Sequence, residues 1–460
     1  MKVIKIGGGC LHGKETIGRI LDLVATRARG HIVVVSALNG ITDVLINGMK
    51  TALEDESAIP GLIGHIKARH MLVARYLIKS REALRLYRRD LDQRAAKLER
   101  RYYGLSFTRE VTARSQDVIS SSGERFSAEL LSAALRSRGV PAFCRMPHKI
   151  GMLTDGKFGD ATARLPQTAS NFRLHLAPQL KSDTVLFIPG FFGVSEDGDI
   201  TTFGRGGSDY SAAVVAAAMD AEVLEIWKDV DGFMSADPRM VPEAELIPVL
   251  SYEEAAELAY FGAKILHPRT VEPVRRKKIR ITIKNTLNPD AEGSSIAARS
   301  PRPPRIVKSV SFIRDIGILK VHAAGVGTRP GILAQIAGAL TEGGINIKSV
   351  VTSQTCISLL LAEADLDRGR QALMALNPRP FRQIARLDDV VLISIVGDGL
   401  LNKKGIAARC FSAVAGCGVN VEMISFGPSR AALYFLVKTR DLHSAVNAIH
   451  STFFATARCT

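Results

Sequence analysis

Short apolar runs alternate with helical patterns over the first 300 residues of this 460-residue chain. The runs predict strands, and the stretches between them repeat apolar residues every three to four positions, as amphipathic helices do. The predicted strands are Val3–Ile6, Ile32–Ser36, Val185–Ile188, Val223–Trp227 and Ile279–Lys284. The predicted helices include Lys14–Ala28, Glu124–Ser137, Asp209–Met219, Tyr252–Ala259 and Arg269–Lys277. This alternation indicates an α/β fold with a parallel sheet covered by helices.

A long amphipathic segment, residues 61–114, interrupts the alternation and predicts a helical insertion. It holds 14 Lys and Arg residues against five Asp and Glu residues, so it carries more than half of the chain's net charge of +16. The charges are scattered among apolar residues at helical spacing, and we interpret them as the solvated face of a helical hairpin. A nucleic-acid surface is the alternative, but no aromatic stacking pattern or recognised binding motif accompanies the charge. We therefore expect no nucleic-acid partner.

An internal repeat follows the proline-rich break Arg299–Pro304, which predicts a linker. The first copy has the expected elements Ile316–His322, Gly331–Leu340, Gly344–Ile347, Cys356–Ala362 and Asp367–Leu376, and the second has Val390–Val396, Gly405–Val414, Gly418–Val421, Ala431–Val437 and Leu442–His450. This βαββα order with glycine-rich turns resembles the ACT domain, a small regulatory module that binds amino acids. An ordinary α+β repeat without a ligand is the alternative.

Each repeat needs a closing strand. The first has its own candidate at Phe381–Leu387, whereas the second ends at a helix with only a short tail. A spare apolar strand, Val307–Phe312, precedes the first repeat. We predict that this strand crosses to complete the sheet of the second repeat, so that the first repeat is inserted within the second.

The composition is that of an ordinary globular protein, with 46% hydrophobic and 23% charged residues. No run approaches the roughly 20 apolar residues that a membrane span needs, and the N-terminal run ends in glycines too early for a signal peptide. The six cysteines form no C-x-x-C pair and no cluster with histidines, so we expect them to be reduced. We therefore expect a cytoplasmic protein with no membrane partner.

Two glycine-rich segments are candidates for binding anionic groups. Lys5-Ile6-Gly7-Gly8-Gly9 runs from a strand into glycines, where backbone N–H groups can approach a phosphate beside a lysine. Thr201–Tyr210 places three glycines around Arg205 and then opens a helix with Ser208-Asp209, an arrangement that suits a carboxylate or phosphate. The G-x-x-x-x-G-K-[ST] pattern of a P-loop is absent.

Three further segments carry polar residues next to predicted strands or helices. In Val33–Asp43 a strand ends at Ser36, and Thr42 then binds a ligand or, alternatively, caps the next helix. Glu225–Gly232, followed by Ala236–Arg239, places acids and a lysine at a strand end, which suits ribose and Mg²⁺-phosphate contacts. Leu258–Pro268 ends a helix with Lys264.

Together these segments resemble the aspartokinases, which belong to the amino-acid kinase family. The resemblance spans essentially the whole chain and rests on the order of K-x-G-G, S-A-x-x-G-x-T-D, S-x-G-E-R-x-S-A, G-R-G-G-S-D-Y-S-A, E-I-W-K-D-V-D-G, A-D-P-R and F-G-A-K-x-L-H-P-R-T. It implies a three-layer α/β/α kinase domain with the helical insertion, followed by two ACT domains. The implied divisions are a kinase domain at 1–298 and a linker at 299–306, then a first ACT domain at 307–387 that includes a strand, 307–312, for the second, and a second ACT domain at 388–460.

The resemblance implies transfer of the γ-phosphate of ATP, with Mg²⁺, to the side-chain carboxylate of L-aspartate, the first step of lysine, threonine, methionine and isoleucine biosynthesis. It also implies allosteric ACT domains that join subunits into a homodimer or larger homo-oligomer. The implied catalytic residues are Lys5, Arg205 and Asp209. The implied substrate-binding residues are Thr42, Glu124, Phe191, Thr202, Arg205 and Ser208. The implied ATP-binding residues are Lys5, Gly7, Gly8, Ser36, Lys228, Asp229, Phe233, Arg239 and Lys264, while Mg²⁺ is carried mainly by the ATP phosphates.

This sequence departs from the family pattern at two places. The usual K-F-G-G-T-S ends here in Gly9-Cys10, which removes two hydroxyls near the phosphates and predicts altered kinetics. Lysine-sensitive relatives tend to carry acids where the first repeat has Lys348 and Gln354, so we expect threonine rather than lysine as effector. The alternatives are an amino-acid kinase for another small carboxylate, such as glutamate, and a catalytically weak ligand sensor.

Overall fold

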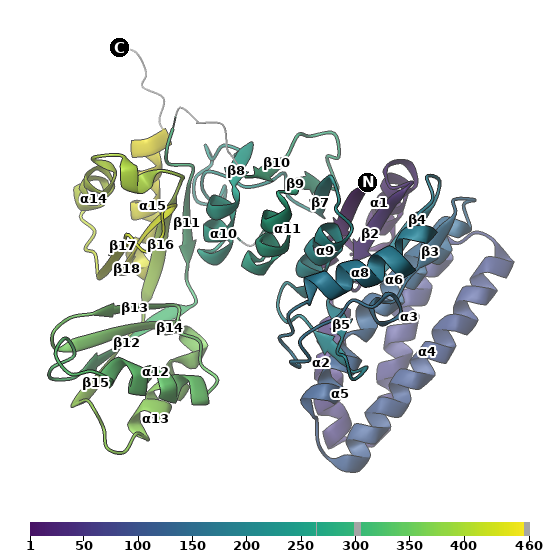
Figure 1. Cartoon of the computed structure of the whole chain (residues 1–460), viewed down its shortest axis with the longest axis horizontal. Coiled ribbons are helices and arrows are strands. Elements are labelled where there is room, and N and C mark those ends of the chain that lie inside the picture. Colours follow the sequence, from purple (N-terminus) through teal and green to yellow (C-terminus); the bar gives the residue numbers. More distant parts are fainter. Residues whose placement is uncertain (264, 299–304, 455–460) are drawn as a thin grey trace, which may run out of the picture. The chain divides into compact units, whose positions relative to one another are not determined.

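The computed structural model describes residues 1–263, 265–298 and 305–454 (Figure 1). Lys264 and positions 299–304 of the expected linker lie outside these described residues. The chain divides into two compact units. Unit 1 comprises Met1–Phe233, Pro248–Ala256 and Lys264–Pro301, and unit 2 comprises Met234–Ile247, Glu257–Ala263 and Arg302–Thr460.

An eight-stranded sheet forms the centre of unit 1, in the order β3-β4-β2-β1-β7-β9-β10-β8. Its strands are β1 (Lys2–Ile6), β2 (His31–Val35), β3 (Ala142–Cys144), β4 (Val185–Pro189), β7 (Val223–Lys228), β8 (Val249–Ser251), β9 (Arg280–Asn285) and β10 (Ser294–Ala297). Neighbours from β3 to β9 are parallel, but β10 is antiparallel to β9. The expected parallel sheet is therefore mixed at this edge, because a short connection between neighbouring strands can only form an antiparallel pair.

Helices cover both faces of the sheet, which gives the three-layer α/β/α fold. They are α1 (Lys14–Arg27), α2 (Ile41–Glu54), α3 (Ile59–Leu77), α4 (Arg81–Thr108), α5 (Ala113–Ser120), α6 (Ser122–Arg136), α7 (Pro147–Ile150), α8 (Leu165–His175), α9 (Gly207–Ala218), α10 (Tyr252–Tyr260) and α11 (Val271–Lys277). Ile4 and Ile6 of β1 point into the core that α1 and α6 share. Because side chains alternate along a strand, Lys5 points to the opposite face, where α9 packs.

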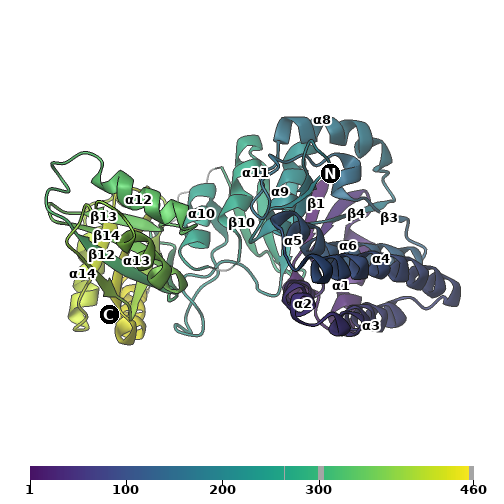
Figure 2. The ribbon, with the colours of Figure 1, turned by 90° about the horizontal axis from the view of Figure 1, so that it is seen from below.

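The basic segment forms a hairpin of two long helices, α3 and α4, which pack against each other (Figure 2). Its apolar side joins the main core through residues such as Leu91 and Leu98. The buried hydroxyl of Tyr102 donates a hydrogen bond to the Leu45 carbonyl oxygen of α2, 2.9 Å away. Most of the charged residues stay exposed, as expected for the solvated face of an amphipathic hairpin.

Unit 2 contains two antiparallel four-stranded sheets, in the orders β13-β14-β12-β15 and β11-β16-β18-β17. The strands are β11 (Ser309–Ile313), β12 (Ile316–His322), β13 (Ser349–Thr352), β14 (Cys356–Ala362), β15 (Gln383–Leu387), β16 (Val390–Val396), β17 (Met423–Phe426) and β18 (Ala432–Lys438). Helices α12 (Ile332–Glu342) and α13 (Leu366–Met374) cover the first sheet, and α14 (Ile406–Gly416) and α15 (Leu442–Phe454) cover the second. This is the fold of two ACT domains.

The chain enters the second sheet before it builds the first. Strand β11 pairs antiparallel with β16, with Ser309 opposite Val396 and Ile313 opposite Leu392. The chain then forms all of β12–β15 before it returns to the second sheet. Strands β13 and β17 begin later than the sequence pattern predicted. The residue after each turn glycine still bonds back to the end of the preceding helix, as the Ile345 N–H does to the Leu340 carbonyl oxygen.

Candidate functional site

Two lysines and an aspartate form an ion-pair group on the α9 face of the sheet. Lys5 Nζ of β1 lies 2.5 Å from Asp209 Oδ1 of α9, and Lys228 Nζ at the end of β7 lies 3.3 Å from Asp209 Oδ2. Burial lowers the pKa of Lys5, and the attraction of Asp209 opposes that change. Burial also pushes the pKa of Asp209 upward, but the two lysines outweigh it and hold that pKa below its usual value. The group keeps one positive charge in excess.

A glycine turn fills the space beside these lysines. A Cβ at Gly7 would lie 3.4 Å from Lys5 Nζ, and one at Gly8 would lie 3.4 Å from the Ala37 carbonyl oxygen and 3.7 Å from Ser36 Cβ. Gly8 opens a short 3₁₀-helix, Gly8–Cys10, whose first N–H groups have no partner within the helix. The turn therefore presents backbone donors next to a surplus positive charge, an arrangement suited to phosphate oxygens.

Glu124 is a buried carboxylate at the start of α6, only 4% exposed. Its Oε1 lies 3.5 Å from Ser208 Oγ, while Oε2 is buried without a hydrogen-bond partner. Burial raises its pKa to about 7, against weaker opposing contributions from hydrogen bonds and Lys5. An unsatisfied buried carboxylate oxygen is costly, and a bound ammonium group would satisfy it.

Arg205 lies in the turn between β6 (Ile200–Thr202) and α9. Its side chain is exposed, and it has no ion pair or hydrogen bond within the part of the chain that the structure describes. The flanking Gly204 and Gly206 have φ values of +69° and +72°, which favour glycine. A Cβ at Gly206 would lie 2.4 Å from His267 Cβ, so position 206 accepts no residue larger than glycine. The guanidinium is free to pair with a carboxylate.

Phe191 has a left-handed backbone, with φ +78°. It precedes the short strand β5 (Phe192–Val194), which pairs with β6. Its N–H donates to Ser211 Oγ of α9 at 2.8 Å, and its ring lies 2.8 Å from where a Cβ of Gly207 would be. A non-glycine residue in this conformation is strained and persists where its surroundings hold it, as at binding sites.

The other predicted residues differ in their surroundings. Thr42 is half-buried in the first turn of α2, and Asp229 is exposed, with Oδ2 3.6 Å from a Cβ position at Gly9. The Phe233 side chain is fully buried, and its N–H donates to Ser294 Oγ. Arg239 belongs to unit 2 and pairs with Asp237, whose pKa this pairing lowers. Lys264 is not among the described residues.

Sequence reasoning missed three polar residues around the site. Ser127 Oγ donates to the Ser36 carbonyl oxygen at 2.5 Å and fixes the end of β2. Arg269 and the buried Asp117 bind segments next to the Arg205 turn. Ser127 and Arg269 belong to recognised motifs and could have been singled out, whereas Asp117 looks like one more helical charge.

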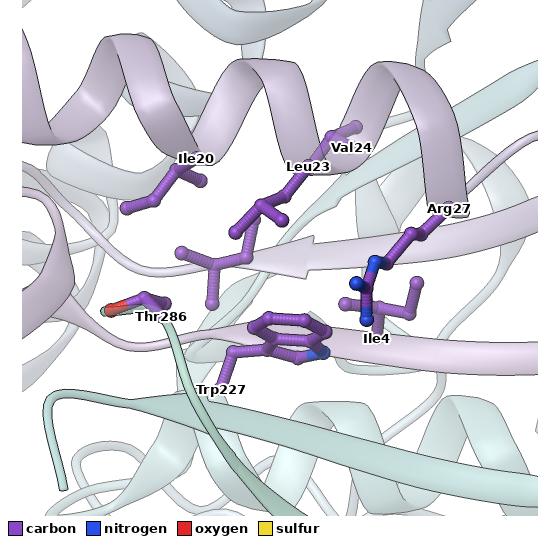
Figure 3. Close-up of a pocket in the computed structure, with 8 residues that line it drawn as sticks. Ile4, Ile20, Leu23, Val24, Arg27, Trp227 and Thr286 are labelled. Carbon is purple, nitrogen blue, oxygen red and sulfur yellow. The ribbon is translucent and has the colours of Figure 1, made fainter. Parts of the chain in front are cut away.

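A small cavity lies on the opposite face of the sheet, between α1 and the strands (Figure 3). Trp227 of β7 forms its floor, and the Arg27 guanidinium lies 5.9 Å from the Trp227 ring centroid. The volume is about 10 Å³ and the lining is mainly apolar. It is too small for a substrate, since even one water needs about this volume.

The described residues contain no helix that is long and apolar enough to cross a membrane. They also contain no group of three or more His, Cys, Asp or Glu side chains that could hold a metal ion.

Two family profiles together match most of the chain. The Amino acid kinase family matches residues 1–285, and the ACT domain matches residues 319–375 and 393–453. Aspartokinase 1, chloroplastic, of Arabidopsis thaliana is 30% identical over 467 residues, which cover 98% of this chain and 80% of that protein. This chain belongs to the aspartokinases. It is an amino-acid kinase that carries ACT regulatory domains.

Other aspartokinases agree with this family placement. The bifunctional aspartokinase/homoserine dehydrogenase of Haemophilus influenzae is 34% identical over 72% of this chain, and the match spans only 41% of that protein. E. coli aspartokinase III in complex with aspartate and ADP (R-state) aligns with a TM-score of 0.83 and 28% identity, covering 99% of this chain and 100% of that one. The same enzyme with lysine and aspartate (T-state) aligns with a TM-score of 0.82, 28% identity and 99% coverage of both chains.

Proposed function

We propose that this aspartokinase transfers the γ-phosphate of ATP to the side-chain carboxylate of L-aspartate and so forms 4-phospho-L-aspartate. The observation that carries the proposal is the buried Lys5–Asp209–Lys228 group beside the Gly7-Gly8 turn. It combines surplus positive charge with backbone donors, which phosphoryl transfer requires. The aspartate and ADP bound by the E. coli relative support the same pair of substrates.

The proposed mechanism needs no general base, because the acceptor carboxylate is already ionised at neutral pH. Catalysis then consists of holding the two substrates in line and of neutralising the charge that shifts during transfer. Lys5 and Lys228 supply positive charge, and Asp209 holds both ammonium groups in place. This division of roles explains why no His–Asp pair is needed in the site.

The aspartate would be recognised at both ends. Glu124 Oε2, which is buried and unpartnered, would accept hydrogen bonds from the α-ammonium group. Arg205 would pair with a carboxylate through two parallel hydrogen bonds. The remaining proposed contacts with aspartate are Thr42, Phe191, Thr202 and Ser208.

The nucleotide would lie across the glycine turn. Gly7, Gly8 and Ser36 are proposed to contact the phosphates, together with Lys5 and Lys228. Phe233 could contribute only through its backbone, since its side chain is fully buried. Arg239 and Lys264 complete the proposed ATP contacts. Mg²⁺ bound to the ATP phosphates would add charge neutralisation, and the exposed Asp229 carboxylate beside Gly9 is the acid best suited to hold it.

We also propose that a neutral amino acid such as threonine, rather than lysine, is the effector. Lys348 immediately precedes β13 in the first ACT domain. Its carbonyl oxygen accepts a 2.9 Å hydrogen bond from the Tyr260 hydroxyl. Its ammonium group lies 5.8 Å from the Tyr260 ring centroid, so a cation already occupies this region. The lysine in one E. coli structure belongs to that protein.

The ACT domains are proposed to join subunits into a homodimer or larger oligomer. Strands β13 and β17 are outer strands of their sheets. Val350, Ile424 and Phe426 on these strands are 38%, 48% and 38% exposed, and exposed apolar edges favour pairing with another chain. Sedimentation of the full chain would measure the size of the oligomer.

A cytoplasmic location stays a prediction from cysteine usage, and the five described cysteines are free thiols.

A coupled assay of ADP release tests the proposed reaction. Aspartate should support turnover, and acyl phosphate should be trapped as the hydroxamate when hydroxylamine is added. Glutamate and other small carboxylates, tested in parallel, distinguish the paralogous-kinase alternative. If none of these acids supports ADP release but ligands still bind measurably, the result would favour a catalytically weak ligand sensor.

A further inference from the structure

Asp117 is a buried carboxylate in the middle of α5, only 2% exposed. Its Oδ2 accepts hydrogen bonds from the Gly159 N–H at 2.9 Å and the Thr202 N–H at 2.8 Å. Its Oδ1 accepts a third from Thr202 Oγ1 at 2.7 Å. No cationic side chain pairs with it among the described residues, so these three neutral donors alone satisfy the charge.

The carboxylate is not needed to build its own helix. Thr112 caps α5, since its Oγ1 accepts a hydrogen bond from Ser115 N–H at 3.1 Å. Burying an unpaired charge is costly, and hydrogen bonds to a charged acceptor are stronger than neutral ones. The contacts of Asp117 are therefore strong restraints, and they act on two other segments, at Gly159 and Thr202.

Both segments border the turn that carries Arg205. Thr202 is the last residue of β6, three positions before Arg205. The Gly159 carbonyl oxygen lies 2.9 Å from where a Cβ of Gly204 would be, so the Gly159 segment supports the turn directly. Asp117 thus holds the strand that enters the turn and the segment on which the turn rests.

Arg269 joins the same two segments independently. Its Nη1 donates to the Phe203 carbonyl oxygen at 3.1 Å and lies 2.5 Å from Asp160 Oδ1. Its Nη2 donates to the Ala161 carbonyl oxygen at 2.7 Å. Two charged side chains, one negative and one positive, therefore fix the base of this turn.

The turn itself has little intrinsic rigidity. Gly204 and Gly206 flank Arg205, and glycine adopts many backbone conformations at low cost. The Arg205 side chain has no partner of its own in the described structure. The direction in which Arg205 points is therefore set from outside the turn, and small displacements of such a group are costly for catalysis.

We propose that Asp117 is a positioning residue for substrate binding, which acts by holding the Arg205 turn through Thr202 and Gly159. The inference rests on the proposed role of Arg205 in binding the aspartate carboxylate. The same contact limits the hydrogen bonds that Thr202 can make to a substrate, because its single hydroxyl proton is donated to Asp117. Thr202 can therefore offer a substrate only lone pairs, which suit an ammonium group and not a carboxylate.

The kinetic test compares Thr202→Val with Thr202→Ser, and both with Asp117→Asn. Thr202→Val removes the hydroxyl donor at nearly constant shape, whereas Thr202→Ser keeps it. We expect the KM for aspartate to rise about tenfold or more in Thr202→Val and Asp117→Asn, with the KM for ATP within about twofold of wild type. Because Thr202→Ser keeps the hydroxyl that donates to Asp117, its KM for aspartate should lie well below that of Thr202→Val. The double variant Asp117→Asn/Thr202→Val should be little worse than either single one.

Limited trypsin digestion provides a readout that does not depend on kinase activity. Cleavage after the exposed Arg205 should be faster in Asp117→Asn and Thr202→Val under native conditions, because the turn is released. Glu254→Gln is the matched control, since Glu254 of α10 is also buried and accepts a 2.7 Å hydrogen bond from the Ser251 N–H of β8. It should lower thermal stability while leaving cleavage at Arg205 and the KM for aspartate unchanged.

The outcomes separate this inference from the proposed function. Unchanged cleavage at Arg205 in both variants, or equal increases in the two KM values, would overturn the positioning role. Faster cleavage in a protein that does not phosphorylate aspartate would support the role of Asp117 on the turn and contradict the proposed substrate.

Discussion

The ammonium of Lys5 lies 2.5 Å from the carboxylate of Asp209, and neither side chain is more than 7% exposed. Lys5→Ala removes a cation whose attraction should strengthen as charge moves onto the transferred phosphoryl group. We expect kcat to fall by ~10²-fold or more in a steady-state assay. Lys2→Ala is the control, because Lys2 lies on the same strand but is 42% exposed and pairs with Glu225. A loss of only a few-fold would assign charge neutralisation to Lys228.

Arg205→Lys keeps the positive charge but loses the planar pair of donors. The KM for aspartate should rise far more than the KM for ATP, since only the carboxylate substrate uses both donors. Steady-state kinetics with each substrate varied in turn measures the two constants. Arg114→Lys is a matched control at an exposed arginine that pairs with Asp199. Equal changes in both constants would argue against this role for Arg205.

Glu124 should make aspartate binding depend on pH. Its pKa is raised by burial to about 7, from an ordinary value of 4.5. Only the ionised form accepts hydrogen bonds from the α-ammonium group, so kcat/KM for aspartate should fall about tenfold per pH unit below pH 7. Glu124→Gln should lower kcat/KM and remove this limb of the profile. A wild-type profile that is flat between pH 5.5 and about 8 would contradict the assignment.

The same pKa has a consequence for stability. Because the folded-state pKa lies above the unfolded one, the contribution of Glu124 to stability is fully present below pH 4.5 and is lost as the pH rises through about 7. Thermal unfolding of the unliganded protein should therefore show a loss in this window that Glu124→Gln does not share. Saturating aspartate should offset the loss, because its ammonium group favours the ionised carboxylate.

Free lysine should inhibit poorly. At an effective dielectric constant of 20, two like charges about 6 Å apart repel by roughly 3 kcal/mol before screening, which is on the order of a hundredfold in affinity. The cation at Lys348 would impose this repulsion on a bound lysine. Titration of kinase activity with lysine and threonine separately checks it, and inhibition by submillimolar lysine alone would contradict it.

A charge reversal extends this test. Lys348→Glu should increase sensitivity to lysine, since it converts the repulsion into attraction. Lys403→Glu, at an exposed lysine of the second ACT domain, changes the net charge equally and should leave sensitivity unchanged. The same response in both variants would show a general effect of charge.

Gly9→Thr should be tolerated and should improve nucleotide use. A Cβ at position 9 would make an ordinary contact with Asp229 Oδ2 at 3.6 Å, so a Cβ is accepted there without a clash. The threonine found in the family motif would return a hydroxyl near the phosphates, and the KM for ATP should fall. Melting temperature serves as the check on folding, and an unchanged or higher KM would show that the glycine is not a defect.

The fold was largely predictable from local pattern. Apolar runs such as Val3–Ile6 and the helical periodicity between them were sufficient for the α/β class, and the repeated glycine turns were sufficient for the ACT domains. The polar strand β10 (Ser294–Ala297) gave no such signal, so the mixed edge of the sheet was missed. Its pairing with β9 depends on the short connection and on neighbouring strands, which a single-strand pattern does not contain.

The candidate site was predictable where its chemistry is concentrated in short motifs. Lys5, Glu124 and Arg205 each stand among glycines or small residues, and the structure brings Lys5 to Asp209 and Glu124 to Ser208. Asp117 could not be found in this way. Its importance comes from hydrogen bonds to residues 42 and 85 positions away, which depend on the tertiary fold.

The pairing of β11 with β16 separates the order of synthesis from the order of completion. Strand β11 leaves the ribosome before any residue of the first ACT domain, yet its partner strand is made only after that domain is finished. Val310 is 1% exposed in the complete fold, and it lacks its β16 neighbour Ile395 until that strand has been made. The domain that starts first is therefore finished last, and a nascent chain halted after β15 would expose an unpaired apolar strand to chaperones.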